Sequence, residues 1–67
     1  MDADLEEGTR IGRFLVLRDV EGQRHAVAIG AVSAVGETDH GVILLLPGGR
    51  LIHAPQPIER MLQWLAG

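Results

Sequence analysis

Short apolar runs, separated by turns rich in glycine and charge, occupy most of the chain from residue 13 onward. Residues 13–18 form an apolar run between two arginines, which predicts a strand. Residues 24–29 alternate polar or small side chains with larger ones, as a half-buried strand does. Gly22 stands in the turn between them, where a positive φ is needed. These two runs therefore predict a β-hairpin.

A second hairpin is predicted from residues 42–54. Residues 42–46 are the strongest strand candidate, and residues 50–54 follow as an antiparallel partner after a turn at Pro47 and Gly48. Residues 37–41 predict a tight connection, with Gly41 suited to a left-handed position. Residues 30–36 predict a short helical turn that leads into a strand; the alternative is a continuous strand kinked at Gly30.

The last ten residues carry a helical pattern. Pro57 suits the first turn of a helix, and one apolar stripe follows at Ile58, Met61, Leu62 and Leu65. The fold class expected is mainly β (α+β): a four-stranded antiparallel sheet of hairpins with a C-terminal amphipathic helix. We expect residues 1–10 to be a flexible acidic tail and residues 11–67 to form a single domain.

Size and composition limit how this domain is stabilised. A chain of 67 residues buries only about 60% of the surface that it exposes when unfolded, and small folds usually need disulfides, a metal or oligomerisation as well. The chain has no cysteine, so self-association is the option that remains. The acidic N-terminus is unlike a signal peptide, and no apolar run reaches the roughly 20 residues of a membrane-spanning helix. We therefore expect a cytoplasmic protein.

The run at residues 42–46 is apolar toward both faces of a sheet, a pattern typical of a strand covered on both sides. One short helix covers one face only. A second copy of the chain is the simplest cover for the other face, so the sequence predicts a homodimer. The interface candidates on this strand are Val42, Leu44 and Leu46.

The helix supplies two more interface candidates, Met61 and Trp64. Trp64 lies about 60° outside Met61 on a helical wheel, at the edge of the apolar stripe. It can seal its own domain, or it can anchor a partner, since tryptophan is enriched at interfaces. Both interpretations stay open at this point.

No catalytic, metal-binding or cofactor-binding site is predicted. His25 and His53 fall in predicted strands without a thiol or carboxylate at ligand spacing. Ser33 is the only serine and lacks a nucleophile-elbow context. Gly48 and Gly49 are not followed by the lysine of a phosphate-binding loop. We therefore expect a protein that is not an enzyme and has no cofactor.

All six basic residues are arginines, and four of them surround the predicted strands. These are Arg13, Arg18, Arg24 and Arg50. They either form a solvated edge that blocks unwanted strand addition or line a face that binds an acidic protein. Nucleic-acid binding is a weaker alternative, because Phe14 and Trp64 are the only aromatic residues and single-strand binding usually needs stacking platforms.

The order of elements resembles the small flagellar and swarming-motility proteins. The residues that carry the resemblance are the turn at 21–23, the apolar positions Ile29, Val32 and Val35, the turn at Gly49 and Arg50, and the closing helix. A similar order occurs in LytTR-type DNA-binding domains, but the basic loops of those domains are missing here. The resemblance implies an accessory role in motility without enzyme activity.

Together these observations predict a small non-catalytic protein-binding module that acts stoichiometrically on a larger protein assembly. One alternative is a phage or mobile-element inhibitor of a host complex, either anti-defence, such as an anti-CRISPR protein, or directed at transcription. The others are a motility accessory protein and nucleic-acid binding through the arginine edge. The partner is expected to be a protein, with no membrane association.

Overall fold

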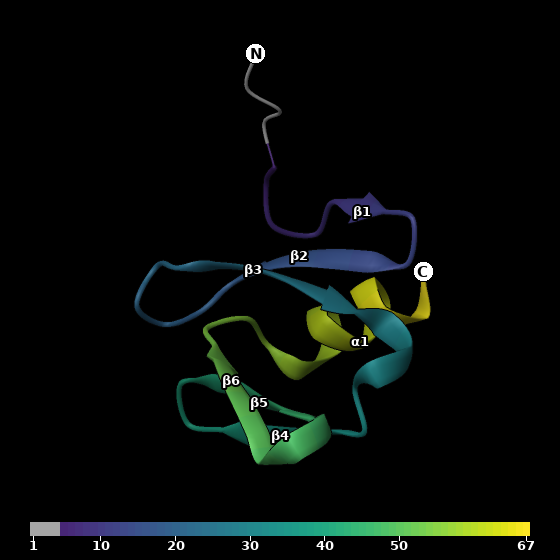
Figure 1. Ribbon diagram of the computed structural model, residues 1–67. Helices are drawn as coiled ribbons and strands as arrows, with labels where there is room; N and C mark the ends of the chain where they lie inside the picture. The colour runs from purple at the N-terminus through teal and green to yellow at the C-terminus, as the bar shows by residue number, and fades with distance from the viewer. Residues whose placement is uncertain (1–4) are drawn as a thin grey trace.

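The computed structural model describes residues 5–67, which form two small antiparallel sheets and one helix (Figure 1). The first sheet has the order β1 (Arg10–Ile11), β2 (Phe14–Arg18) and β3 (Arg24–Ala28). The second has the order β4 (Ala34–Thr38), β5 (Gly41–Leu46) and β6 (Arg50–Ala54). The helix α1 (Ile58–Ala66) follows the second sheet and lies beside it.

The mainly β class with a C-terminal helix is confirmed, but the single four-stranded sheet is wrong. The expected strands correspond to β2, β3, β5 and β6. Between the hairpins, the helical turn η1 (Ile29–Ala31) redirects the chain and then leads into β4. Because the chain changes direction at η1, β4 pairs with β5 instead of extending the first sheet.

The segment just before β1 lies along β2. The Gly8 N–H donates to the Val16 carbonyl, and the Val16 N–H donates to the Thr9 carbonyl, each at 2.9 Å. The C-terminal part of the expected flexible tail is therefore held by backbone pairing, which depends little on side-chain identity. Residues 1–4 of that tail lie outside the described residues.

The core lies between the inner faces of the two sheets and the helix. Its fully buried side chains include Leu15 and Leu17 from β2, Val42 and Leu44 from β5, and Met61 from α1. The alternation is clear in β5, where even-numbered residues face inward. Burying these side chains removes apolar surface from water, the main driving force for folding.

Helix α1 begins after Pro57, as predicted, but its apolar stripe is rotated from the expected one. Leu62 is 50% exposed, whereas Trp64 and Leu65 pack against the core. The helix lies against β4 and β5, and the Trp64 ring also lies close to Gly8 in the N-terminal segment. No helix in residues 5–67 is long and apolar enough to cross a membrane.

Gly41 closes the β4–β5 hairpin where it meets the end of β6. Its φ is 148°, a conformation that L side chains rarely adopt. A Cβ atom at this position would also clash with the carbonyl oxygen of Ala54. Glycine is therefore required here for two independent reasons.

Candidate functional site

The second sheet has one face toward the core and one away from it. We call the second surface the outer face; it consists of Ala34 and Gly36 on β4, Ile43 and Leu45 on β5, and Leu51 and His53 on β6. These residues form two cross-strand rows, Ala34–Leu45–Leu51 and Gly36–Ile43–His53. None of the six is an acid, a lysine or an arginine.

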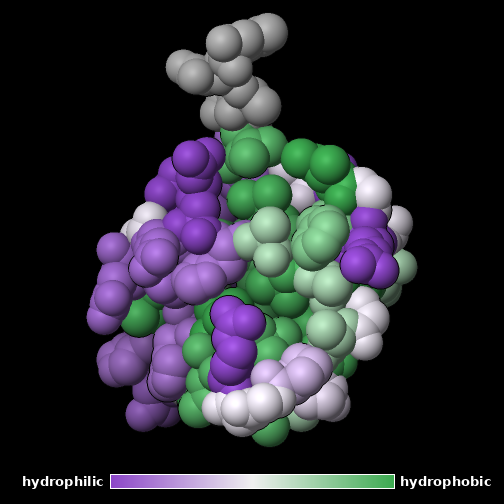
Figure 2. Space-filling model, viewed as in Figure 1, coloured by the Kyte–Doolittle hydropathy of each residue, from purple (hydrophilic) through white to green (hydrophobic). Residues whose placement is uncertain are grey.

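The outer face exposes large apolar side chains to solvent. Leu45 is 41% exposed and its neighbour Leu51 is 53% exposed; Ile43 in the next row is half-buried. Single exposed leucines are common, whereas contiguous apolar patches on a surface are a feature of interaction sites. On the side of the whole molecule that is in view in Figure 2, hydrophobic residues run through the middle and hydrophilic residues lie along the left.

Three of the expected interface residues belong instead to the core. Val42 is 1% exposed, and Leu44 and Met61 are fully buried. Because five consecutive apolar residues give no sign of which alternate set faces the helix, the sequence could not distinguish Val42 and Leu44 from Ile43 and Leu45. The exposed set is the one that a partner can reach. The sequence also gives no indication that Leu51, on the neighbouring strand, is exposed.

The Trp64 side chain, which belongs to α1, contacts the N-terminal segment. Its indole ring is so close to Gly8 that a Cβ atom there would lie 2.8 Å from Cε2. The Trp64 carbonyl also accepts a hydrogen bond from Arg10 at 3.4 Å. These contacts favour the interpretation of Trp64 as a residue that seals its own domain.

The turn between β2 and β3 is organised by Asp19. One carboxylate oxygen accepts hydrogen bonds from the N–H groups of Glu21 and Gln23, and the other bonds the His25 ring at 2.8 Å. The bond from His25, together with that from the Gln23 N–H, lowers the pKa of Asp19 below its ordinary value. This network fixes the turn and the start of β3.

The three histidines do not gather into a ligand cluster. His25 is engaged by Asp19, His40 lies at the tip of the β4–β5 hairpin, and the His53 carbonyl accepts a hydrogen bond from the Val20 N–H at 2.8 Å. Within residues 5–67, no three His, Cys, Asp or Glu side chains are arranged to hold a metal ion.

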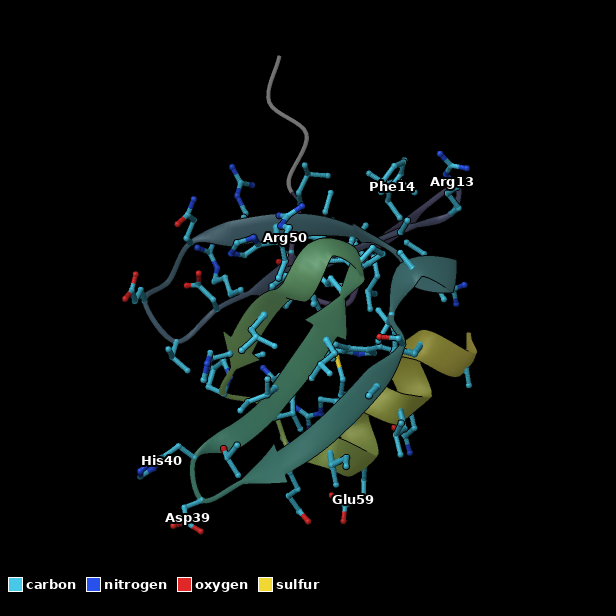
Figure 3. All side chains as sticks on the ribbon, turned by 60° about the horizontal axis from the view of Figure 1, so that its bottom comes forward. Arg13, Phe14, Asp39, His40, Arg50 and Glu59 are labelled. Carbon is cyan, nitrogen blue, oxygen red and sulfur yellow. The ribbon has the colours of Figure 1, made fainter. Side chains whose placement is uncertain are left out.

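The four candidate arginines occupy different places. Arg18 donates to the Gly22 carbonyl at 2.7 Å and so braces the β2–β3 turn. Arg13 lies over the ring of Phe14 at 5.5 Å, at the end of the first sheet (Figure 3). Arg24 begins β3 and is exposed, whereas Arg50 begins β6 and lines a cavity between the sheets.

That cavity, which we call the open seam, separates β3 from β6. It has a volume of about 340 Å³. Ala26, Val27 and Ala28 of β3 line one side, and Arg50 and Ile52 of β6 line the other. Phe14 and Leu46 also border it. The open seam thus brings together Leu46 and Arg50, two of the residues that the sequence singled out.

Comparison with protein-family models, curated protein sequences and solved structures finds no match to this chain. The resemblance to motility proteins therefore stays a prediction.

Proposed function

We propose that this chain is a non-catalytic protein-binding module that self-associates through the outer face of its second sheet. The observation that carries the proposal is the uncharged apolar surface formed by Ile43, Leu45 and Leu51. Covering it removes leucine and isoleucine side chains from water, at about 25 cal/mol for each Å² of apolar surface buried. A domain of this size gains proportionally more from such burial than a larger one does.

A second copy is the occupant that the chemistry of the outer face favours. None of its six residues is an acid, a lysine or an arginine, so a partner surface that matches it is itself apolar and uncharged. In an isologous interface the same patch is used by both subunits, and the outer face of a second copy meets this requirement.

The shape of the outer face also suits a second copy. On β4 it has the small residues Ala34 and Gly36, whereas the larger side chains of Ile43 and Leu45 project from β5. Across a two-fold axis, the large side chains of β5 in each copy can pack over the small residues of β4 in its partner. Such interdigitation gives the dense packing that stable interfaces require.

The test compares the oligomeric state of two leucine variants by sedimentation equilibrium at micromolar concentrations. Leu45→Glu places like charges opposite each other in the interface and is expected to give a monomer. Leu62→Glu is the matched control, because Leu62 has similar exposure but lies on α1; it is expected to stay dimeric like the wild type.

A wild-type protein that remains monomeric at high micromolar concentration would overturn the proposal. So would a dimer that is lost in Leu62→Glu and kept in Leu45→Glu, since the contact would then involve the helix. Circular dichroism of both variants establishes that each is folded.

A further inference from the structure

The edge of β3 that faces the open seam presents unpaired backbone groups. The Ile29 N–H donates to the Arg13 carbonyl and the Asp19 N–H to the Gln23 carbonyl, each at 2.9 Å. Hydrogen-bonded positions alternate along an antiparallel strand, so these two bonds determine which residues of β3 direct their backbone N–H and C=O groups away from β2. These residues are Arg24, Ala26 and Ala28.

This edge is accessible along its length. Ala26 is exposed and Ala28 is half-buried, and both line the open seam. Neither carries a side chain large enough to obstruct an approaching backbone. The edges of the other sheet are β4 and β6. β4 lies next to α1, and the His53 carbonyl of β6 already accepts a hydrogen bond from the Val20 N–H. The β3 edge is therefore the better template for an added strand.

The described residues that line the open seam include one arginine, Arg50, and no Asp or Glu. His25 also lines the cavity, and its ring is bonded to the carboxylate of Asp19, which does not line it. Arg24 starts the β3 edge, and Arg13 packs on Phe14, which borders the cavity. Arginine binds carboxylates through two parallel hydrogen bonds, so this arrangement selects an acidic segment.

We propose that the open seam binds an extended acidic peptide of a partner protein, which adds to β3 as an extra strand. Backbone groups of Ala26 and Ala28 pair with the peptide, and Arg50 binds a carboxylate on the side facing β6. Apolar side chains of the peptide contact Phe14 and Ile52. This site is separate from the outer face, so it does not depend on dimer formation.

The test measures fluorescence anisotropy of a labelled peptide of alternating valine and glutamate. The protein carries Leu45→Ser, which removes an outer-face contact without adding charge, so that binding is measured independently of the dimer. We expect the acidic peptide to bind at least about tenfold more tightly than a valine–lysine peptide. N-methylation of alternate peptide nitrogens is expected to abolish binding, because strand addition needs those N–H groups.

Two arginine variants locate the site. Arg50→Glu is expected to weaken binding by about tenfold or more. Arg60→Glu, on α1, should leave it unchanged, since Arg60 faces Gln56 instead of the open seam. In NMR spectra, the amide signals of Ala26 and Ala28 should shift when the peptide binds. The same signals should shift in Arg50→Glu once enough peptide is added to overcome its lower affinity.

Several results would overturn the inference. Equal affinity for the N-methylated peptide would exclude strand addition, and equal affinity for the lysine peptide would exclude selection by charge. Tighter binding of a single-stranded oligonucleotide than of the acidic peptide would assign the arginines to nucleic acid. Because the background variant lacks an outer-face contact, a failure here leaves the proposed dimer untouched, and the reverse also holds.

Discussion

Asp19 holds the β2–β3 turn through its charge, so its contribution depends on pH. Its pKa is lowered in the folded protein from an ordinary value of 3.8 by the bonds from His25 and the Gln23 N–H. Between the two pKa values the unfolded chain binds more protons than the folded one, so acid favours unfolding. The stabilisation is complete above the ordinary pKa and is lost as pH falls through the lower, folded-state value.

We therefore expect Asp19→Asn to be less stable than the wild type near neutral pH, and the difference to shrink as the pH falls below about 4. Urea unfolding at a series of pH values measures it. Asp39→Asn, at the tip of the other hairpin, is the matched control. A difference for Asp19→Asn that stays constant down to the acid limit would contradict this account.

Residue-level chemistry was partly readable from the sequence. Gly41 was expected to take a left-handed position, and its φ of 148° confirms that a glycine is needed there. The bond between Asp19 and His25 was not expected, because the chain between them can take many paths and only the strand register brings the two side chains together.

At the level of elements, the β4–β5 hairpin depends on the close approach of Gly41 to β6. Gly41→Ala is expected to destabilise the protein by about 2 kcal/mol or more, because the Cβ would both meet the Ala54 carbonyl and disfavour the backbone conformation. Gly30→Ala is the control: a Cβ there has open space, and the change should stay within about 0.5 kcal/mol. Chemical denaturation measures both, and equal effects would disprove the steric explanation.

The elements themselves were largely predictable, whereas their grouping was not. Local apolar runs and turn glycines located β2, β3, β5, β6 and α1. The division into two sheets depends on η1, where three residues turn the chain, and on packing between residues far apart in sequence. The same reason explains why Leu62 is exposed while Trp64 packs against the core. A helical wheel gives the apolar side of α1, but the elements that the helix packs against determine which residues are covered.

At the level of the whole molecule, dimer formation links stability to concentration. Ligands or partners that bind only the folded state raise the melting temperature. A tenfold rise in protein concentration raises the free energy of unfolding of the dimer by about 1.4 kcal/mol. This corresponds to an increase in melting temperature of roughly 3–5 °C for a domain of this size. Differential scanning calorimetry should show this increase for the wild type.

Leu45→Glu should show no such increase, because a monomer unfolds independently of concentration. Leu62→Glu should follow the wild type. A wild-type melting temperature that is constant over a hundredfold range of concentration would contradict the proposed dimer, whatever the absolute stability of the variants.

The candidate surfaces were predicted only in outline. The two-sided apolar strand correctly indicated a sheet with an apolar outer face, but the identity of the exposed set followed from the position of the helix. The open seam was not expected at all. It arises because β3 and β6 belong to different sheets, a feature that no local sequence pattern encodes.

The short connection at η1 also has a consequence for how the chain reaches its native state. Every strand pairs with a strand adjacent to it in sequence, so each sheet closes only small loops, at low entropic cost. Chains dominated by such local pairings fold quickly. We therefore expect each meander to form through local contacts, whereas the contacts between the meanders and α1 join residues far apart in sequence.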